Sequence, residues 1–182
     1  MKTRLTSVAL AALALTLAAG VQAQEKVKIG LITDMSSLYS DVEGKNGALA
    51  IQMAIDDFGG KALGQPIELM SGDHQNKAEI AASKAREWID TAGLTMVFGG
   101  TNSGTALAMA KVAQEKKRVY FNNGAASSAL TNEQCSPYTV HYAYDTVALA
   151  KGTGAAVVDQ GGKTWFFLTA DYAFGHALEA DT

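Results

Sequence analysis

Short apolar segments and amphipathic segments alternate along most of this 182-residue chain. Apolar or alternating runs predict strands at residues 27–33, 67–70, 96–99 and 119–121. Apolar residues at helical spacing predict helices at residues 44–58, 77–92 and 103–116. Strands and helices in this order form a parallel sheet with right-handed crossovers and helices on both faces. We therefore predict an α/β fold with a doubly wound parallel sheet.

The alternation changes after residue 130. Residues 138–144 are predicted to form an extended, aromatic crossing segment, and a helix is expected at 145–159. Residues 164–168, with the sequence TWFFL, predict a fully buried strand, and a further helix begins after residue 174. One strand with one and a half helices is too little for a separate core. We expect the sequence to be part of a protein about twice as long.

The N-terminus has the three regions of a secretory signal peptide. Lys2 and Arg4 form a basic start, residues 8–19 are almost wholly apolar, and VQA at 21–23 supplies small residues for cleavage. We predict a signal peptide at residues 1–23, with cleavage before Gln24 and a periplasmic mature protein. An uncleaved anchor is the alternative, but the apolar run is short for a membrane span.

Composition argues against several classes of function. Fifteen basic and eighteen acidic residues give a net charge of −3 without a basic cluster, so no nucleic-acid partner is expected. The three histidines lack the spacing of metal ligands, and we predict neither a metal nor a cofactor. The single cysteine, Cys135, is interpreted either as a small buried residue or as one whose partner lies elsewhere.

Two loops rich in small polar residues follow predicted strands. Residues 99–105 read GGTNSGT and lead directly into a helix, and residues 122–128 read NNGAASS. Both belong to the carboxyl edge of the sheet, where parallel α/β sheets bind ligands. Free backbone N–H groups and small hydroxyls there favour a small anionic group, such as a carboxylate. The alternative is that both loops are ordinary strand-to-helix turns.

Enzymatic alternatives lack their motifs. In GTNSG at 100–104 the serine stands one position too late for a nucleophile elbow. The segment GGKT at 161–164 imitates the end of a phosphate-binding loop, but Val157 occupies the position of the required first glycine. We predict a binding protein that is not an enzyme.

Six segments, taken together and in order, resemble the periplasmic leucine/isoleucine/valine-binding proteins of ABC importers, which are type I periplasmic substrate-binding proteins. They are VKIG at 27–30, DMSSLY at 34–39, GKNGA at 44–48, GGTNS at 99–103, GAASSALT at 124–131 and DYAFG at 171–175. The resemblance covers residues 26–182. It implies the type I periplasmic-binding-protein fold, in which two α/β lobes close on a ligand.

The resemblance also implies a division of the chain and a set of ligand contacts. Residues 24–140 would form a nearly complete lobe one, and residues 141–182 a hinge crossing and a truncated lobe two. Ser103 matches the position that holds the ligand's carboxylate, Ala125 and Ala126 match the second loop, and Phe174 matches an aromatic residue of lobe two. The expected ligand-binding residues are Tyr39, Thr101, Asn102, Ser103, Gly124, Ala125, Ala126 and Phe174.

The function that the resemblance implies is capture of a small carboxylate, foremost a branched-chain or related amino acid. The expected partner is the membrane permease of an ABC importer, and the full-length protein is expected to be a monomer. Two departures from the family, Ala126 without a hydroxyl and Phe174 without a phenol, leave open an aromatic or other carboxylate. Tyr144 and Tyr172 would suit such a ligand, although packing in the core is the preferred interpretation. A ligand-sensing receptor ectodomain of the same fold also stays open.

Overall fold

The computed structural model describes residues 25–182, so the predicted signal peptide lies outside the described residues. Six strands form one sheet in the spatial order β2-β3-β1-β4-β5-β6. Their bounds are β1 Val27–Thr33, β2 Lys61–Ala62, β3 Gln65–Asp73, β4 Met96–Phe98, β5 Val119–Asn122 and β6 Thr139–His141. Every pair is parallel except β2 with β3. The predicted doubly wound α/β sheet is confirmed.

The strand order places a topological switch point beside β1. From β1 the chain moves outward to β3 and then returns to the other side of β1 to form β4, β5 and β6 in succession. Ile29 pairs with Met96, and Val97 pairs with Tyr120, so β1, β4 and β5 end at one edge of the sheet. Ligands of open α/β sheets bind at such an edge.

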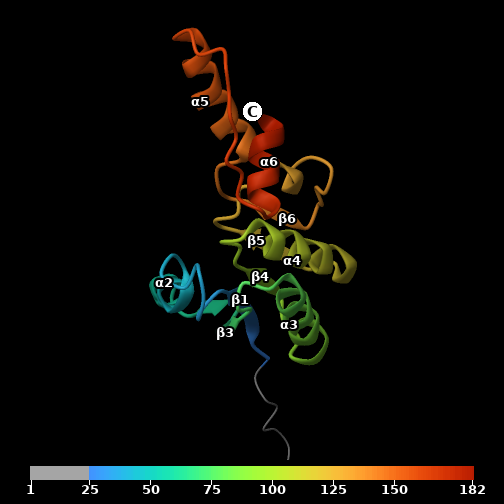
Figure 1. The fold of residues 1–182 in the computed structure, drawn as a ribbon. Coiled ribbons are helices and arrows are strands. Elements are labelled where there is room, and N and C mark those ends of the chain that lie inside the picture. The colour runs from blue at the N-terminus through green and yellow to red at the C-terminus, as the bar shows by residue number, and fades with distance from the viewer. Residues whose placement is uncertain (1–24) are drawn as a thin grey trace, which may run out of the picture.

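Helices cover both faces of the sheet. Their bounds are α2 Gly44–Asp57, α3 Ala78–Thr91, α4 Ser103–Lys116, α5 Thr146–Asp159 and α6 Ala173–Asp181, with a short 3₁₀ turn at Ser128–Leu130. Helix α2 lies on one side of the sheet and α3 and α4 on the other, while α5 and α6 lie together beyond β6 (Figure 1). Within residues 25–182 no helix has both the length and the apolar character needed to cross a membrane.

The core lies between the sheet and the pair α3 and α4. Alanines on the facing sides of these two helices allow close approach, and larger side chains from the strands fill the space above them. The fully buried members include Ile32, Ala81, Ala85, Leu94, Val97, Met109, Ala113 and Tyr120. Burial of such apolar surface is the main favourable term in folding.

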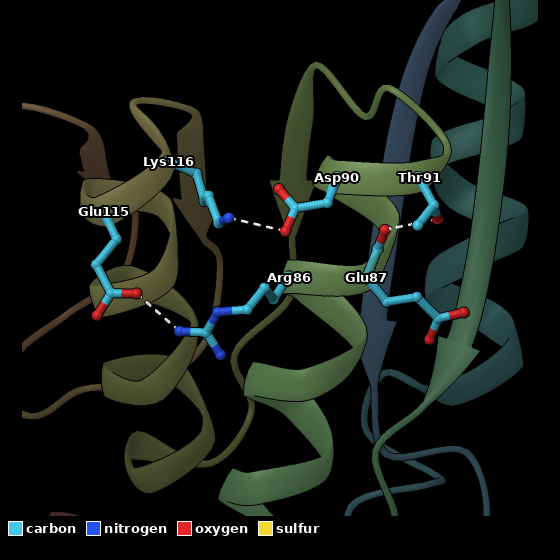
Figure 2. A network of polar contacts seen from close by, with 6 residues as sticks. All are labelled: Arg86, Glu87, Asp90, Thr91, Glu115 and Lys116. Carbon is cyan, nitrogen blue, oxygen red and sulfur yellow. Dashed lines mark hydrogen bonds and ion pairs between the residues drawn. The ribbon is translucent and has the colours of Figure 1, made fainter.

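Two ion pairs join α3 to α4 on the outside of this core (Figure 2). Arg86 contacts Glu115 at 2.7 Å, and Lys116 contacts Asp90 at 2.8 Å. All four side chains are partly exposed, so solvent screens the attraction and each pair contributes about 0–1 kcal/mol. The buried alanines, rather than these pairs, therefore hold the two helices together.

Helix α2 differs from its predicted packing. Ile55 is buried, but Phe58, which was expected on the same apolar stripe, is exposed. Phe58 lies just past the last helical residue as the C-cap, so it no longer follows the helical spacing that would place it on the buried stripe. The prediction of a continuous buried stripe is therefore wrong at its C-terminal end.

A short hairpin precedes β3 that the sequence did not predict. Leu63 and Gly64 join β2 to β3 and have φ values of 52° and 79°, the sign that a two-residue type I′ turn requires. Leu-Gly is not one of the usual residue pairs of this turn. For this reason the sequence did not predict the hairpin. Strand β3 is also longer than the predicted strand at 67–70.

Residues 164–168 do not form the predicted buried strand. Trp165 is 41% exposed and Leu168 is 95% exposed, and the segment has no strand pairing. A buried parallel strand needs sheet neighbours, and the described sheet ends at β6. Cys135 is also exposed, so the buried alternative for this residue is wrong.

Candidate functional site

A small cavity lies where the loops after β1, β4 and β5 meet. Its volume is about 100 Å³, and it is lined by Tyr39, Thr101, Ser103, Gly124, Ala126, Tyr144, Tyr172 and Phe174. Six of the eight ligand-binding residues expected from the sequence are among these; Asn102 and Ala125 are not. Segments more than 130 residues apart, such as those of Tyr39 and Tyr172, meet here.

A larger hollow of about 560 Å³ opens at the opposite edge, where β1 begins. Its charged side chains are already engaged: Lys26 pairs with Glu68 at 2.8 Å, and Lys28 donates to the Ala92 carbonyl. Parallel α/β sheets bind ligands at the carboxyl edge. The smaller cavity is therefore the candidate site.

Two glycines allow the loop after β4 to enter the site. Gly99 and Gly100 have φ values of 132° and 129°, which residues with a side chain rarely adopt. A Cβ on Gly99 would collide with the carbonyl of Ile32, and one on Gly100 would collide with the Asn122 side chain. The missing side chains let the backbone pass close to both neighbouring strands.

The loop then starts α4 with a capped N-terminus. The Oδ1 atom of Asn102 accepts hydrogen bonds from the N–H groups of Gly104 and Thr105, at 2.7 and 3.3 Å. Asn102 is therefore the N-cap residue of α4. The side-chain oxygen that we expected to contact a ligand is used by the helix instead. Asn102 therefore shapes the site without lining it.

Two residues with hydroxyl groups, Thr101 and Ser103, line the cavity beside this helix start. Ser103, the first residue of α4, is 1% exposed, and its Oγ accepts a hydrogen bond from the Ser127 N–H at 3.3 Å. Its own hydroxyl proton remains available to a ligand. The buried hydroxyl of Thr101 has no hydrogen-bond partner among residues 25–182. A helix N-terminus with free hydroxyls suits an anionic group.

Asn122, at the end of β5, shapes the second loop. Its side-chain amide donates to the Ala125 carbonyl at 2.6 Å and accepts from the Ala125 N–H at 3.1 Å. Both backbone groups of Ala125 are therefore used within the loop, and the residue does not line the cavity. Gly124 and Ala126, on either side of it, do.

Carboxylates fix the loop after β1 that carries Tyr39. The buried Asp34 carboxylate accepts from the Ser37 hydroxyl at 2.6 Å and from the Tyr39 N–H at 2.9 Å. Burial raises the pKa of Asp34, but these hydrogen bonds, with those from the Ser36 and Ser37 N–H groups, outweigh it and hold the pKa below its usual value. Asp73, from β3, accepts from Met35 and Ser36 of the same loop.

Aromatic side chains form the other side of the cavity. The Tyr39 hydroxyl donates to the Tyr172 hydroxyl at 2.9 Å, and the Tyr172 ring lies 5.9 Å from that of Phe174. Burial and the contact with Tyr39 raise the pKa of Tyr172, which keeps its phenol neutral. Tyr144 is 58% exposed, so the interpretation of this residue as core packing is wrong.

Sequence reasoning missed three residues that position the loops. Asn122 and Asn123 were read only as members of a small polar loop, and Glu43 was read only as the end of a loop. An asparagine directly after a strand is a signal for an Asx-type turn and could have identified Asn122. Nothing local in the sequence identifies Glu43, because its partners lie 10 and 80 residues away.

The cavity has two chemically different ends. One end offers hydroxyls and a helix N-terminus to an anion, and the other offers flat apolar surfaces. Within the described part of the chain, no three His, Cys, Asp or Glu side chains gather in a way that could hold a metal ion. The polar end of the cavity has the chemistry to hold a small anionic group such as a carboxylate.

Comparison with known proteins places these features in a wider group. A family model described as "Periplasmic binding protein" matches residues 26–182. No curated protein sequence matches the chain.

Several solved structures share the fold. A periplasmic binding protein from Burkholderia mallei is 70% identical, with a TM-score of 0.83, over 86% of this chain and 42% of its own. A periplasmic ligand-binding protein of a branched-chain amino acid ABC transporter from Burkholderia xenovorans is 41% identical, with a TM-score of 0.74, over 85% and 41%.

A third structure contains a ligand. The solute-binding protein of an ABC transporter from Rhodopseudomonas palustris, solved in complex with 3,4-dihydroxybenzoic acid, is 27% identical, with a TM-score of 0.76, over 86% of this chain and 42% of its own. The chain thus spans about two fifths of the length of these relatives.

Proposed function

This chain belongs to the periplasmic binding protein family, and from that premise we propose that it captures a small carboxylate for an ABC importer. The observation that carries the proposal is one cavity formed by the loops after β1, β4 and β5 together with Tyr144, Tyr172 and the first turn of α6. Its anion-binding groups come from the sheet edge, and its aromatic groups come partly from residues after 141. The protein binds and releases its ligand without converting it.

Ser103 is the proposed anchor of the ligand. Its hydroxyl proton and its N–H, which as part of the first helical turn lacks an intrahelical partner, would both donate to the carboxylate. The Thr101 hydroxyl, which has no hydrogen-bond partner among residues 25–182, would supply a further hydrogen bond. The α4 dipole stabilises negative charge at the same place.

Two classes of carboxylate are candidates for the rest of the ligand. A branched-chain amino acid is the class expected from the sequence, and the Burkholderia xenovorans relative is described for such a transporter. Tyr39, Tyr144, Tyr172 and Phe174 around the cavity favour an aromatic carboxylate, since aromatic rings pair at 4.5–7 Å. The relative that binds 3,4-dihydroxybenzoic acid supports this second class.

Calorimetry on the complete protein tests both the site and the ligand class. The panel contains leucine, isoleucine, valine, phenylalanine, benzoate and 3,4-dihydroxybenzoate. Ser103→Ala should weaken the best of them by roughly 1.5–3 kcal/mol, about ten- to a hundredfold in affinity. Ser83→Ala, an exposed position on α3, is the matched control and should bind as wild type does. Equal affinity of Ser103→Ala and wild type would rule out this anchor.

Several further properties belong to the same proposal. Residues 24–140 form lobe one, and residues 141–182 form the hinge crossing and the start of lobe two. The mature protein is a periplasmic monomer that starts at Gln24 and delivers its ligand to a membrane permease. Mass spectrometry of periplasmic material should find Gln24 at the N-terminus; intact Met1 in the membrane fraction contradicts this. A receptor ectodomain, the alternative, requires a transmembrane segment in the same polypeptide.

A further inference from the structure

We propose that Glu43 is a positioning residue that holds two walls of the candidate site at a fixed separation. The inference rests on the proposed function, because it concerns the same cavity. Glu43 does not line that cavity. It acts through the loop of Tyr39 on one side and the loop of Gly124 on the other.

The contacts of Glu43 join three segments. One carboxylate oxygen, Oε1, accepts a hydrogen bond from the Asn123 side-chain amide at 2.6 Å. The other, Oε2, accepts from the Thr33 hydroxyl. The Glu43 N–H donates to the Tyr39 carbonyl at 3.4 Å.

These contacts supply a connection that the sheet does not make. Thr33 is the last residue of β1 and Asn123 follows β5, but β4 lies between these two strands. Sheet hydrogen bonds therefore do not join the ends of β1 and β5 directly. The Glu43 carboxylate joins the end of β1 to the residue after β5, across the end of β4. Its partner Asn123 precedes Gly124 of the cavity lining, and Glu43 itself lies four residues after Tyr39.

The environment of Glu43 argues against two simpler roles. Glu43 stands at the N-cap position of α2, but its side chain makes no capping hydrogen bond. It is 6% exposed, and no Lys, Arg or His of residues 25–182 forms an ion pair with it. A buried carboxylate without a cation is costly for stability unless hydrogen bonds compensate it. Here the donors come from the two elements that border the site.

Three substitutions and one double variant distinguish a role of Glu43 in positioning the two loops from a role only in the stability of the fold. Glu43→Ala removes both side-chain contacts. Glu43→Gln can keep both, by accepting from Asn123 and donating to Thr33. Asn123→Asp places two carboxylates against each other, and the double variant Glu43→Gln/Asn123→Asp restores a donor–acceptor pair with reversed direction.

The first arm of the test uses the complete protein without ligand. Hydrogen exchange should speed up in residues 122–128 in Glu43→Ala and Asn123→Asp, and should return toward wild type in Glu43→Gln and in the double variant. Glu115→Ala, an exposed glutamate on α4, is the matched control. This arm does not depend on any ligand, so it tests Glu43 even if no member of the panel binds.

The second arm measures affinity for the panel ligand that binds best. Glu43→Ala and Asn123→Asp should each lose about tenfold or more, while Glu43→Gln and the double variant stay within about threefold of wild type. Unchanged exchange in Glu43→Ala overturns the inference, as does failure of the double variant to recover relative to Asn123→Asp. Absence of binding by wild type overturns the proposed function instead.

Discussion

At Gly100 the absence of a side chain lets the loop after β4 pass the end of β5. A Cβ there would meet the Asn122 side chain and the Tyr120 hydroxyl, and Tyr120 is fully buried. The same hydroxyl donates to the Gly99 carbonyl at 2.8 Å, so the contact cannot open without losing a hydrogen bond. The candidate site depends on this close approach.

Gly100→Ala should lower the free energy of unfolding by more than about 1 kcal/mol, since it adds both backbone strain and a collision. Gly59→Ala is the control, because Gly59 has a φ of 89° but no atom within 4 Å of its Cβ position. Both variants place a side chain at a positive φ, and only Gly100→Ala adds a collision. Urea unfolding measures the difference; equal losses would remove the collision from the explanation.

His74 is the residue whose protonation should matter most between pH 5.5 and 7.5. It is fully buried, Nδ1 accepts from the Asn76 N–H at 3.0 Å, and Nε2 has no partner in the part of the chain that the structure describes. Burial lowers the pKa of His74, although Asp34 and Asp73 oppose this. The folded protein therefore favours the neutral ring.

Because the unfolded chain binds the proton more readily, stability should fall as the pH is lowered through about 6.5, the usual histidine value. The slope from this group is at most about 1.4 kcal/mol per pH unit. Asp34 and Asp73, whose pKa values are lowered, lose their stabilising effect only at more acidic pH. Urea unfolding at pH 7.5 and 5.5 should show a smaller pH effect in His74→Asn than in wild type; identical pH effects contradict this.

At the scale of elements, Asn102 has two possible roles at the N-terminus of α4, as a ligand contact or as a helix cap. The resemblance suggested a ligand contact, and the structure uses the side chain as a helix cap. Asn102→Ala should cost about 0.5–2 kcal/mol of stability, and Asn102→Asp should recover most of it, since both Asn and Asp are good caps. Thermal unfolding and calorimetry are measured on the same variants. A loss of affinity in Asn102→Ala without a loss of stability would favour a direct ligand contact.

The elements also show where sequence patterns succeed. Helix α4 was predicted with its observed bounds, because a continuous pattern of apolar residues at helical spacing is a local signal. Residues 164–168 have an equally strong apolar pattern, but no strand forms. An apolar run indicates only that a segment is compatible with burial. Whether the segment is buried depends on neighbouring elements from elsewhere in the chain.

At the scale of the whole molecule, the cavity lies between the sheet edge and the start of α6. The Tyr39–Tyr172 hydrogen bond and the position of Phe174 link residues on either side of the proposed hinge. A ligand that contacts both sides can shift an equilibrium between open and closed forms, whereas a ligand that contacts one side cannot.

Small-angle scattering on the complete protein should therefore show a smaller radius of gyration after the best panel ligand is added. Phe174→Ala should weaken binding and reduce this compaction. Ser103→Ala should mainly weaken binding, so at saturating ligand it should still become compact. An unchanged scattering profile for saturated wild type would exclude closure, even if calorimetry confirmed binding.

Much of this protein follows from the sequence alone. The order of strands and helices, the parallel sheet and the edge at which the loops gather all follow from hydrophobic periodicity, which is written in neighbouring residues. The resemblance carried by short segments in a fixed order named the family that the comparisons then showed. The loops that meet at the cavity were predicted because the ends of parallel strands share an edge.

Only the tertiary structure decided how individual side chains are used. It turned Asn102 into a cap, used the backbone of Ala125 within its own loop, and brought Glu43 to Asn123 across 80 residues. It also brought Tyr172 to Tyr39 and left Phe166 without a neighbour to bury it. The contacts of Glu43 and Tyr172 and the exposure of Phe166 depend on which distant group is brought near, and a local pattern of residues does not specify that group. The bonds of Asn102 and Ala125 are local, but each polar atom had more than one possible partner, and the folded loop selected between them.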